Sequence, residues 1–502
     1  MDPRSAYAEL IHRCREDAYL TSAYGLLGWD EETYMPRAAA EYRGEQLAYL
    51  AGLIHTRGTD PRVGELLHAV EGSEVVADPE SIEAVNVRLL RLAFDRDRQV
   101  PTPLVEEEAR ITPTAQQAWS DARRASDYRI FRPWLAKILA LKREEADAHG
   151  YECRYDGLLE VYDPGLRTAD LNRMFAALRS ELVPLAAQLA TAPGRPSADV
   201  LARRYPVEQQ RVFCERIAAA VGFDFQRGRL DMSTHPFFAT TGPADVRVTA
   251  RFHETNFGDG FFSTLHEVGH GLYEQGLDSL RYGEPVAESP SSALHESQAR
   301  LWENFVGRGR GFWNYAFPIA RRLFPDALNG VNVDAFYAAF NRVAPSINRV
   351  QADEVTYNLH ILIRFELEQA LLSGDLPVDD LPGAWAEKYQ TDLGVIPDTD
   401  ADGCLQDSHW SAGMFGYFPA YAVGTLYAAQ LYHAAETATG GFGEAFAAGD
   451  FTALLGWLRG NIHTVGGRYE APQLIRQVTG AAPDHRPFLT LMRAKYLPLY
   501  GL

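Results

Sequence analysis

The segment FFSTLHEVGHGLYEQG, residues 261–276, contains the pentapeptide HEVGH, whose residue types and spacing could support metal chemistry. On a helix, His266 and His270 lie on one face, so both imidazoles can hold one ion at about 2.0–2.1 Å. Glu267 projects about 100° around the helix from His266, where it is poorly placed as a ligand but can take a proton from a water beside the ion. The pattern predicts a zinc-type site with Glu267 as the general base.

A structural interpretation of HEVGH is also open. Two histidines can fall four residues apart by chance, and the HExxH pattern occurs in proteins that bind no metal. Gly269 and Gly271 lower the helix propensity of the segment. The pentapeptide alone does not distinguish a metal site from a chance pattern, so the metal interpretation needs a third ligand elsewhere in the chain.

A catalytic zinc takes three protein ligands and keeps one position open. Glu274 is close in sequence, but on the same helix it lies about 12 Å along the axis from His266. It therefore cannot complete the site, and could at most support His270 from behind.

The better third ligand follows a helix-breaking loop, in ESPSSALHESQARLWENFVGRG. Pro290, Ser291 and Ser292 signal a helix start. The apolar residues Leu294, Leu301 and Phe305 mark its core face, and Glu296 lies off that face on a helix that can pack back across the first. Two histidines, one glutamate and a water in the fourth position is the metallopeptidase arrangement.

The elements that position these residues are mainly helical. From Asp170 to Leu189 one buried stripe is predicted, with Thr168 as its cap and with apolar residues spaced three and four apart: Leu171, Phe175, Leu178, Leu182, Leu185 and Leu189. Residues 354–372 and much of the rest show similar patterning. The exception is residues 246–252, where apolar and polar side chains alternate as in a strand, so a short β element precedes HEVGH.

Composition limits the class of protein. The chain has 502 residues, 46% hydrophobic and 23% charged, as in an ordinary globular protein of one large domain or two lobes facing a cleft. It has neither a signal-like N-terminus nor a long apolar run, and its four cysteines are scattered, so we expect a cytoplasmic protein. A net charge of −19 argues against nucleic-acid or membrane partners.

Several further motifs, in order along the chain, resemble the carboxypeptidase Taq family of metallocarboxypeptidases. They are WDEETYMP (29–36), HPF (235–237), DVRVT (245–249), HEVGH, HESQ (295–298), INRVQADEVTYNLH (347–360) and GCLQDSHWSAGMFGYFPAY (403–421). One small departure is Ala250, where relatives commonly have a second threonine. So many ordered motifs are far more specific than one HExxH.

The resemblance implies His266, His270 and Glu296 as metal ligands and Glu267 as the catalytic carboxylate. It implies zinc as the cofactor, which cobalt can replace, and release of single amino acids from peptides with a free C-terminus, with broad specificity. It also implies a single metallocarboxypeptidase domain over residues 1–502, with a mainly helical fold and a deep groove similar to neurolysin and angiotensin-converting enzyme, and a homodimer.

Hydrolysis also needs donors for the oxyanion of the tetrahedral intermediate. His409, Tyr417 and Tyr421 carry suitable ring donors, and a histidine followed by tyrosines is similar to the pattern in the related helical peptidases. Alternatively, the tyrosines are packing residues in a glycine-rich turn.

Recognition of a free C-terminal carboxylate favours a guanidinium, which can bind it in a bidentate manner. Arg349 is the first candidate and Arg247 the second, although an ordinary structural ion pair is the more frequent role of an arginine. The strand at residues 246–252 could hold the substrate backbone by edge pairing, or it could belong to a structural hairpin beside the HEVGH helix.

Two other functions are considered. An oligopeptidase that cuts internally would share the ligands and the tyrosine segment, and would cut amidated peptides as well as free acids. A metal-dependent scaffold that has lost catalysis would have no need for Glu267.

Overall fold

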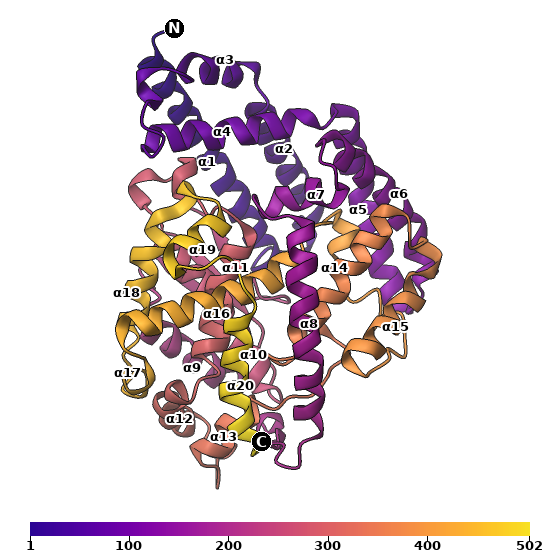
Figure 1. The fold of residues 1–502 in the computed structure, drawn as a ribbon, viewed down its shortest axis with the longest axis vertical. Helices are drawn as coiled ribbons and strands as arrows, with labels where there is room; N and C mark the ends of the chain where they lie inside the picture. The colour runs from indigo at the N-terminus through magenta and orange to yellow at the C-terminus, as the bar shows by residue number, and fades with distance from the viewer.

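The computed structural model describes residues 1–502 and is mainly helical (Figure 1). The helices before the sheet are α1 (Pro3–Thr33), α2 (Ala40–Gly58), α3 (Pro61–Val70), α4 (Ile82–Gln99), α5 (Thr102–Ala125), α6 (Tyr128–Ala148), α7 (Arg154–Tyr162), α8 (Thr168–Thr191) and α9 (Val207–Val221). Those after it are α10 (Phe257–Glu274), α11 (Ser292–Arg300), α12 (Arg310–Leu323), α13 (Val333–Phe340), α14 (Tyr357–Ser373), α15 (Leu381–Leu393), α16 (Pro419–Thr439), α17 (Gly443–Ala447), α18 (Thr452–Asn461), α19 (Ala471–Thr479) and α20 (Arg486–Tyr500). The predicted helical class is confirmed.

The two chain ends lie at opposite ends of the molecule (Figure 1). Helices α1 to α4 form the N-terminal end, and α16 crosses the middle, where it packs along α11. A core of 102 buried apolar residues extends from Ile111 to Tyr500, whereas a separate cluster of seven lies among α1, α3 and α4. The single domain over residues 1–502, with two possible lobes flanking a cleft, stays a prediction.

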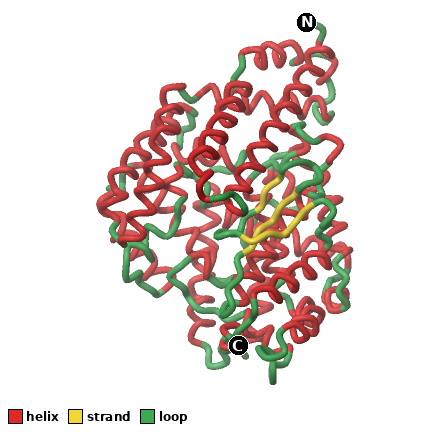
Figure 2. Tube along the Cα trace, turned by 180° about the vertical axis from the view of Figure 1, so that it is seen from behind, coloured by secondary structure: helices red, strands yellow, loops and turns green.

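Three short strands form the only sheet: β1 (Gly228–Met232), β2 (Phe238–Thr240) and β3 (Val246–Ala250), in the order β1-β3-β2 (Figure 2). β3 is parallel to β1 and antiparallel to β2, and it packs against α10. The predicted β element before HEVGH is therefore confirmed. The idea that this strand pairs with substrate at an edge is wrong, because β1 and β2 occupy both edges of β3.

Helix α8 shows how local sequence determines an element. All six apolar residues of the predicted stripe are buried, and each such leucine contributes roughly 1.5–3 kcal/mol relative to exposure. The helix begins at Thr168 itself, so the prediction of Thr168 as the cap is wrong. The backbone N–H of Thr168 donates to the Asp156 carboxylate, 2.6 Å away, and this side chain from α7 caps the helix instead.

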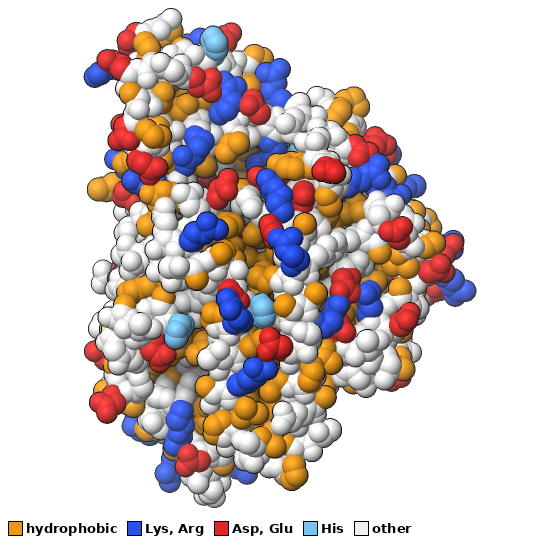
Figure 3. Space-filling model, in the orientation of Figure 1, with side chains coloured by type: hydrophobic (Ala, Val, Ile, Leu, Met, Phe, Trp, Pro, Cys, Tyr) orange, Lys and Arg blue, Asp and Glu red, His pale blue; other side chains and the backbone are white.

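Acidic and basic side chains are interspersed over the face shown in Figure 3. None of the helices combines the length and apolar character needed to cross a membrane.

Candidate metal centre

Helix α10 carries His266, Glu267 and His270. The Asn256 side chain accepts from the backbone N–H of Asp259 and caps the helix. Most of α10 is buried, including Leu265 on the turn before HEVGH. The helix is therefore a fixed internal support, and its low propensity at the two glycines is offset by packing.

The glycines of HEVGH allow close approach of neighbouring elements. A Cβ at Gly269 would lie 2.6 Å from the Ala299 Cα in α11, and one at Gly271 would lie 2.6 Å from the Phe223 ring. Gly269 thus lets the α11 backbone lie directly on α10. Gly271 makes room for Phe223 beside the sheet.

Helix α11 starts where the sequence predicts. The Ser291 hydroxyl accepts from the Leu294 N–H at 3.1 Å, and the buried Asp163 carboxylate accepts from the Ala293 N–H at 2.7 Å. Gly424 of α16 packs against Glu296, because a Cβ there would lie 2.7 Å from its Cγ. Glu296 is therefore held between α10 and α16.

The three predicted ligands converge. Oε2 of Glu296 lies 3.6 Å from Nε2 of His266 and 3.6 Å from Nε2 of His270. Two ligands at about 2.0–2.1 Å from a tetrahedral ion are separated by roughly 3.3 Å. The triad thus has the donor atoms, spacing and burial that a divalent ion of the zinc type needs.

A second layer of charge lies behind the triad. Nδ1 of His266 lies 2.9 Å from Oε2 of Glu303, and Nε of Arg300 donates to Oε1 of Glu296 at 2.6 Å. Arg300 also donates to Glu303 at 3.2 Å. Glu303 belongs to a π-helical turn, Leu301–Val306, that continues α11. These contacts leave one oxygen of Glu296 and one nitrogen of His266 facing the metal position.

Burial sets the protonation of the α10 residues. It raises the pKa of Glu267 to about 7, assisted by the nearby carboxylates Glu296 and Glu303. Burial also lowers the pKa of His270 well below its usual value, together with the adjacent His295. His270 is thus a neutral imidazole, the form that binds a metal.

The candidate oxyanion residues lie together. Nε2 of His409 is 3.0 Å from the Tyr421 hydroxyl, and the rings of Tyr417 and Tyr421 are 5.3 Å apart. Burial lowers the pKa of His409 to about 4, with Arg349 and Arg364 acting in the same direction against Asp407. Tyr421 stands one turn before Gly424, the residue that contacts Glu296, so this cluster adjoins the triad.

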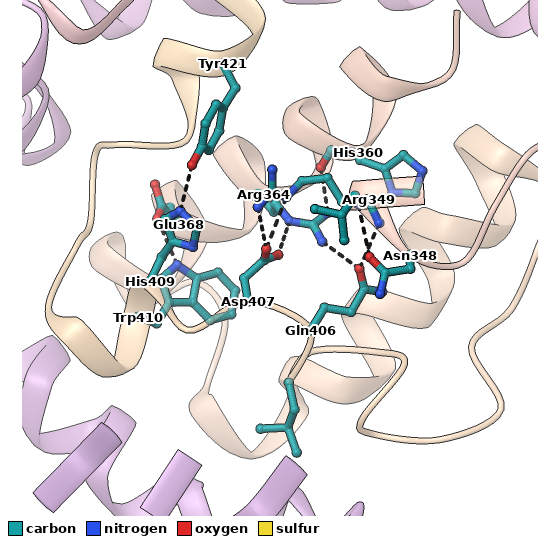
Figure 4. Close-up of polar contacts among 12 residues, drawn as sticks. Asn348, Arg349, His360, Arg364, Glu368, Gln406, Asp407, His409, Trp410 and Tyr421 are labelled. Atoms are coloured by element: carbon teal, nitrogen blue, oxygen red, sulfur yellow. Dashed lines mark hydrogen bonds and ion pairs between the residues drawn. The ribbon is translucent and has the colours of Figure 1, made fainter. Parts of the chain in front are cut away.

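Arg349 belongs to a cluster of polar side chains that also includes Arg364, Asp407 and Gln406 (Figure 4). Asp407 accepts from Arg349 at 2.8 Å and from Arg364 at 2.7 Å, and Gln406 accepts from Arg364 at 3.0 Å. The Arg349 guanidinium lies 4.8 Å from the centre of the Tyr421 ring. Its NH1 donates to the Tyr357 hydroxyl at 3.0 Å.

Arg247 lies elsewhere. It pairs with both oxygens of Asp245 and stacks 4.2 Å from the Trp29 ring of α1. Its neighbour Val248 faces Gly271 of α10, and successive strand residues alternate, so Arg247 points to the opposite side of β3. The structure does not bring Arg247 together with the triad, and its role in substrate binding stays a prediction.

Arg300 and Glu303 had no role in the prediction from sequence. They follow the predicted ligand Glu296 at spacings of four and three, which places all three on one helix face, so this charged pattern could have indicated them. The pairing of Asp407 with two arginines joins segments far apart in the chain. No local pattern could have indicated it.

The fold and the site together indicate the class of protein. Two histidines and a glutamate converge beside a buried carboxylate in a mainly helical chain, which is the arrangement of a metallopeptidase. The profile of the family described as carboxypeptidase Taq (M32) metallopeptidase matches residues 9–496. The chain belongs to this family, and is a metallocarboxypeptidase.

Its relatives match over the full length. The chain is 47% identical to Thermostable carboxypeptidase 1 of Thermus thermophilus over all of both chains. It is 34% identical to Carboxypeptidase 1 of Bacillus subtilis over 98% of each. A solved M32 carboxypeptidase from Deinococcus radiodurans R1 superposes with a TM-score of 0.96, at 40% identity, over 99% of this chain and 100% of that one.

Proposed function

We propose that the chain is a zinc-dependent carboxypeptidase of broad specificity that releases single amino acids from the free C-terminus of peptides, and that cobalt can replace zinc. One observation carries the proposal: a metal-ligand triad and a buried, positively charged cluster lie on either side of Tyr357. Arg300, which pairs with Glu296, stacks 4.0 Å from the Tyr357 ring, and the Tyr357 hydroxyl accepts from Arg349.

The roles of the residues follow from the arrangement. His266, His270 and Glu296 would hold the ion, which when bound supplies a Lewis acid that polarises the scissile carbonyl and acidifies water. Glu267 takes a proton from the attacking water and later delivers it to the leaving amine. His409, Tyr417 and Tyr421 would donate to the developing oxyanion.

The cluster around Asp407 supports recognition of a carboxylate. Two buried guanidiniums, Arg349 and Arg364, form ion pairs with the one carboxylate of Asp407, so the arginines outnumber the carboxylates that pair with them. Arg349 has five N–H donors, and Asp407 and Tyr357 use three of them. A substrate C-terminus would balance the charge and use the remaining donors.

The test compares an N-blocked dipeptide as free acid and as amide. We expect amino-acid release from the free acid alone, its loss with a chelator, and its recovery on adding Zn²⁺ or Co²⁺. Equal cleavage of the amide, or internal cuts in longer peptides, would favour an oligopeptidase. A metal-loaded protein without any cleavage would be a scaffold.

The substitution Glu267→Gln tests the general base. We expect turnover to fall by about 10²- to 10⁴-fold, with the metal content of the purified protein unchanged, because Glu267 is not a ligand. Metal content is measured by elemental analysis of wild type and variant. Loss of metal from the variant would instead assign Glu267 a structural role.

A homodimer and a cytoplasmic location also belong to this proposal. Both rest on the sequence and on its family resemblance. Light scattering of the purified protein tests the dimer, and cell fractionation tests the location.

A further inference from the structure

One ligand histidine is backed by a second histidine. Nδ1 of His270 lies 2.6 Å from Nδ1 of His295, and Nε2 of His295 lies 2.8 Å from Oε1 of Glu274. His295 precedes Glu296 on α11, whereas Glu274 ends α10. The two side chains therefore connect the helices directly behind the metal position.

The positions of the hydrogens between His270, His295 and Glu274 follow from the metal position at one end and the carboxylate at the other. Nε2 of His270 faces Glu296 and needs its lone pair for an ion, so the proton of neutral His270 is on Nδ1. That N–H donates to Nδ1 of His295, which must then carry its own proton on Nε2. The Nε2–H donates to the Glu274 carboxylate, which only accepts.

The other ligand histidine, His266, contacts a carboxylate directly. Nδ1–H of His266 donates directly to Glu303, so each ligand imidazole has a carboxylate behind it, one direct and one relayed. Such partners fix both the tautomer and the ring plane of a ligand.

Packing restricts the relayed pair further. The Phe238 ring of β2 lies 4.7 Å from the His270 ring and 4.7 Å from the His295 ring, at interplanar angles of 30° and 20°. Tyr273 meets His295 edge-on at 5.1 Å. Both imidazoles are thus confined in rotation as well as in hydrogen bonding.

We propose that His295 and Glu274 are positioning residues that fix the tautomer and orientation of His270 for metal binding. This inference rests on the proposed metal site. Neither side chain is a ligand, and their effect is exerted through His270.

The test is the affinity of the metal-free protein for Zn²⁺, measured by competition with a chromophoric chelator. We expect His295→Ala to weaken binding by about 10- to 100-fold. Glu274→Gln, which keeps an acceptor but removes the charge, should weaken it by a smaller factor. His295→Asn places an amide oxygen near the former Nδ1 and should recover part of the loss.

A matched control is His485→Ala. His485 at the start of α20 pairs with Glu181 of α8 and contacts none of the candidate ligands, and its side chain is 14% exposed compared with 13% for His295, so its loss should leave Zn²⁺ affinity unchanged. The visible spectrum of the Co²⁺ form gives a second readout, since a shifted ligand changes its band positions. Circular dichroism verifies that each variant is folded.

Wild-type Zn²⁺ affinity and an unchanged Co²⁺ spectrum in His295→Ala and Glu274→Gln would overturn the inference, even if melting temperature fell. Should His295→Ala fail to fold, Glu274→Gln decides alone. If wild-type protein bound no Zn²⁺, the proposed function itself would fail, and this result differs from equal binding by all variants.

Discussion

At the scale of single residues, the site depends on matching buried charge. Arg300 donates to one oxygen of Glu296 and also to Glu303. Burial alone would raise the pKa of Glu303, but the charges of Arg300 and His266 outweigh this effect and lower the pKa to about 2. Removing one partner of such a group leaves an uncompensated charge. A substitution in a buried ion pair should therefore keep the charge and change only the geometry.

Arg349→Lys is such a substitution. The ammonium keeps the charge but loses the fork that binds a carboxylate in a bidentate manner. We expect KM for an N-blocked dipeptide to rise by about 10- to 100-fold, corresponding to roughly 1.5–3 kcal/mol for hydrogen bonds to a charged group. Steady-state kinetics measures it, with zinc content verified to be normal.

The control is Arg247→Lys, which changes the other candidate in the same way. Because Arg247 faces Trp29 and Asp245, its KM should stay near the wild-type value. A rise in KM with Arg247→Lys and none with Arg349→Lys would reverse the assignment.

At the scale of elements, sequence patterns predicted what is local. Residue spacing indicated α8 and the start of α11, and HEVGH indicated one ligand face, because each depends on neighbours within a few turns. The position of β3 between β1 and β2 depends on strands from separate segments, and the pairing of Asp407 depends on α14. Such long-range contacts leave no periodic signal in one sequence.

The contact of α10 with α11 can be tested at Gly269. Gly269→Ala would place a Cβ 2.6 Å from the Ala299 Cα and 2.8 Å from the Gln298 carbonyl oxygen, both backbone atoms that cannot move alone. We expect a loss of about 1–3 kcal/mol in the free energy of unfolding. Because α11 carries Glu296, Zn²⁺ affinity should also fall, by at least about tenfold.

Gly258→Ala in the first turn of α10 is the matched control. Its Cβ would meet the Phe340 ring at 3.6 Å, an ordinary contact, and alanine favours the helix by about 1 kcal/mol. Denaturant unfolding should show it as stable as wild type or more so. Equal effects of the two substitutions would mean that helix propensity, and not the approach of α11, governs this position.

At the scale of the whole molecule, stability is unevenly distributed. Helix α2 has no buried residue, and the small cluster among α1, α3 and α4 has seven members, whereas the main core has 102. The candidate metal ligands stand on α10 and α11, whose buried apolar residues belong to the main core. Regions with few buried apolar contacts open at a lower free energy than the global unfolding, so the N-terminal end and the site should respond differently to the metal.

Amide hydrogen exchange with and without Zn²⁺ measures this difference. We expect α2 and α3 to exchange fastest among the helices, and α10, α11 and α16 to approach the global limit. An ion that binds only the folded site stabilises it by RT ln(1 + [L]/Kd), about 2.7 kcal/mol at a hundredfold excess over Kd. Zn²⁺ should therefore slow exchange in α10, α11 and α16 but leave α2 unchanged, because α2 opens without disturbing the triad. Equal slowing in α2 would show instead that the N-terminal helices and the metal site open as a single cooperative unit.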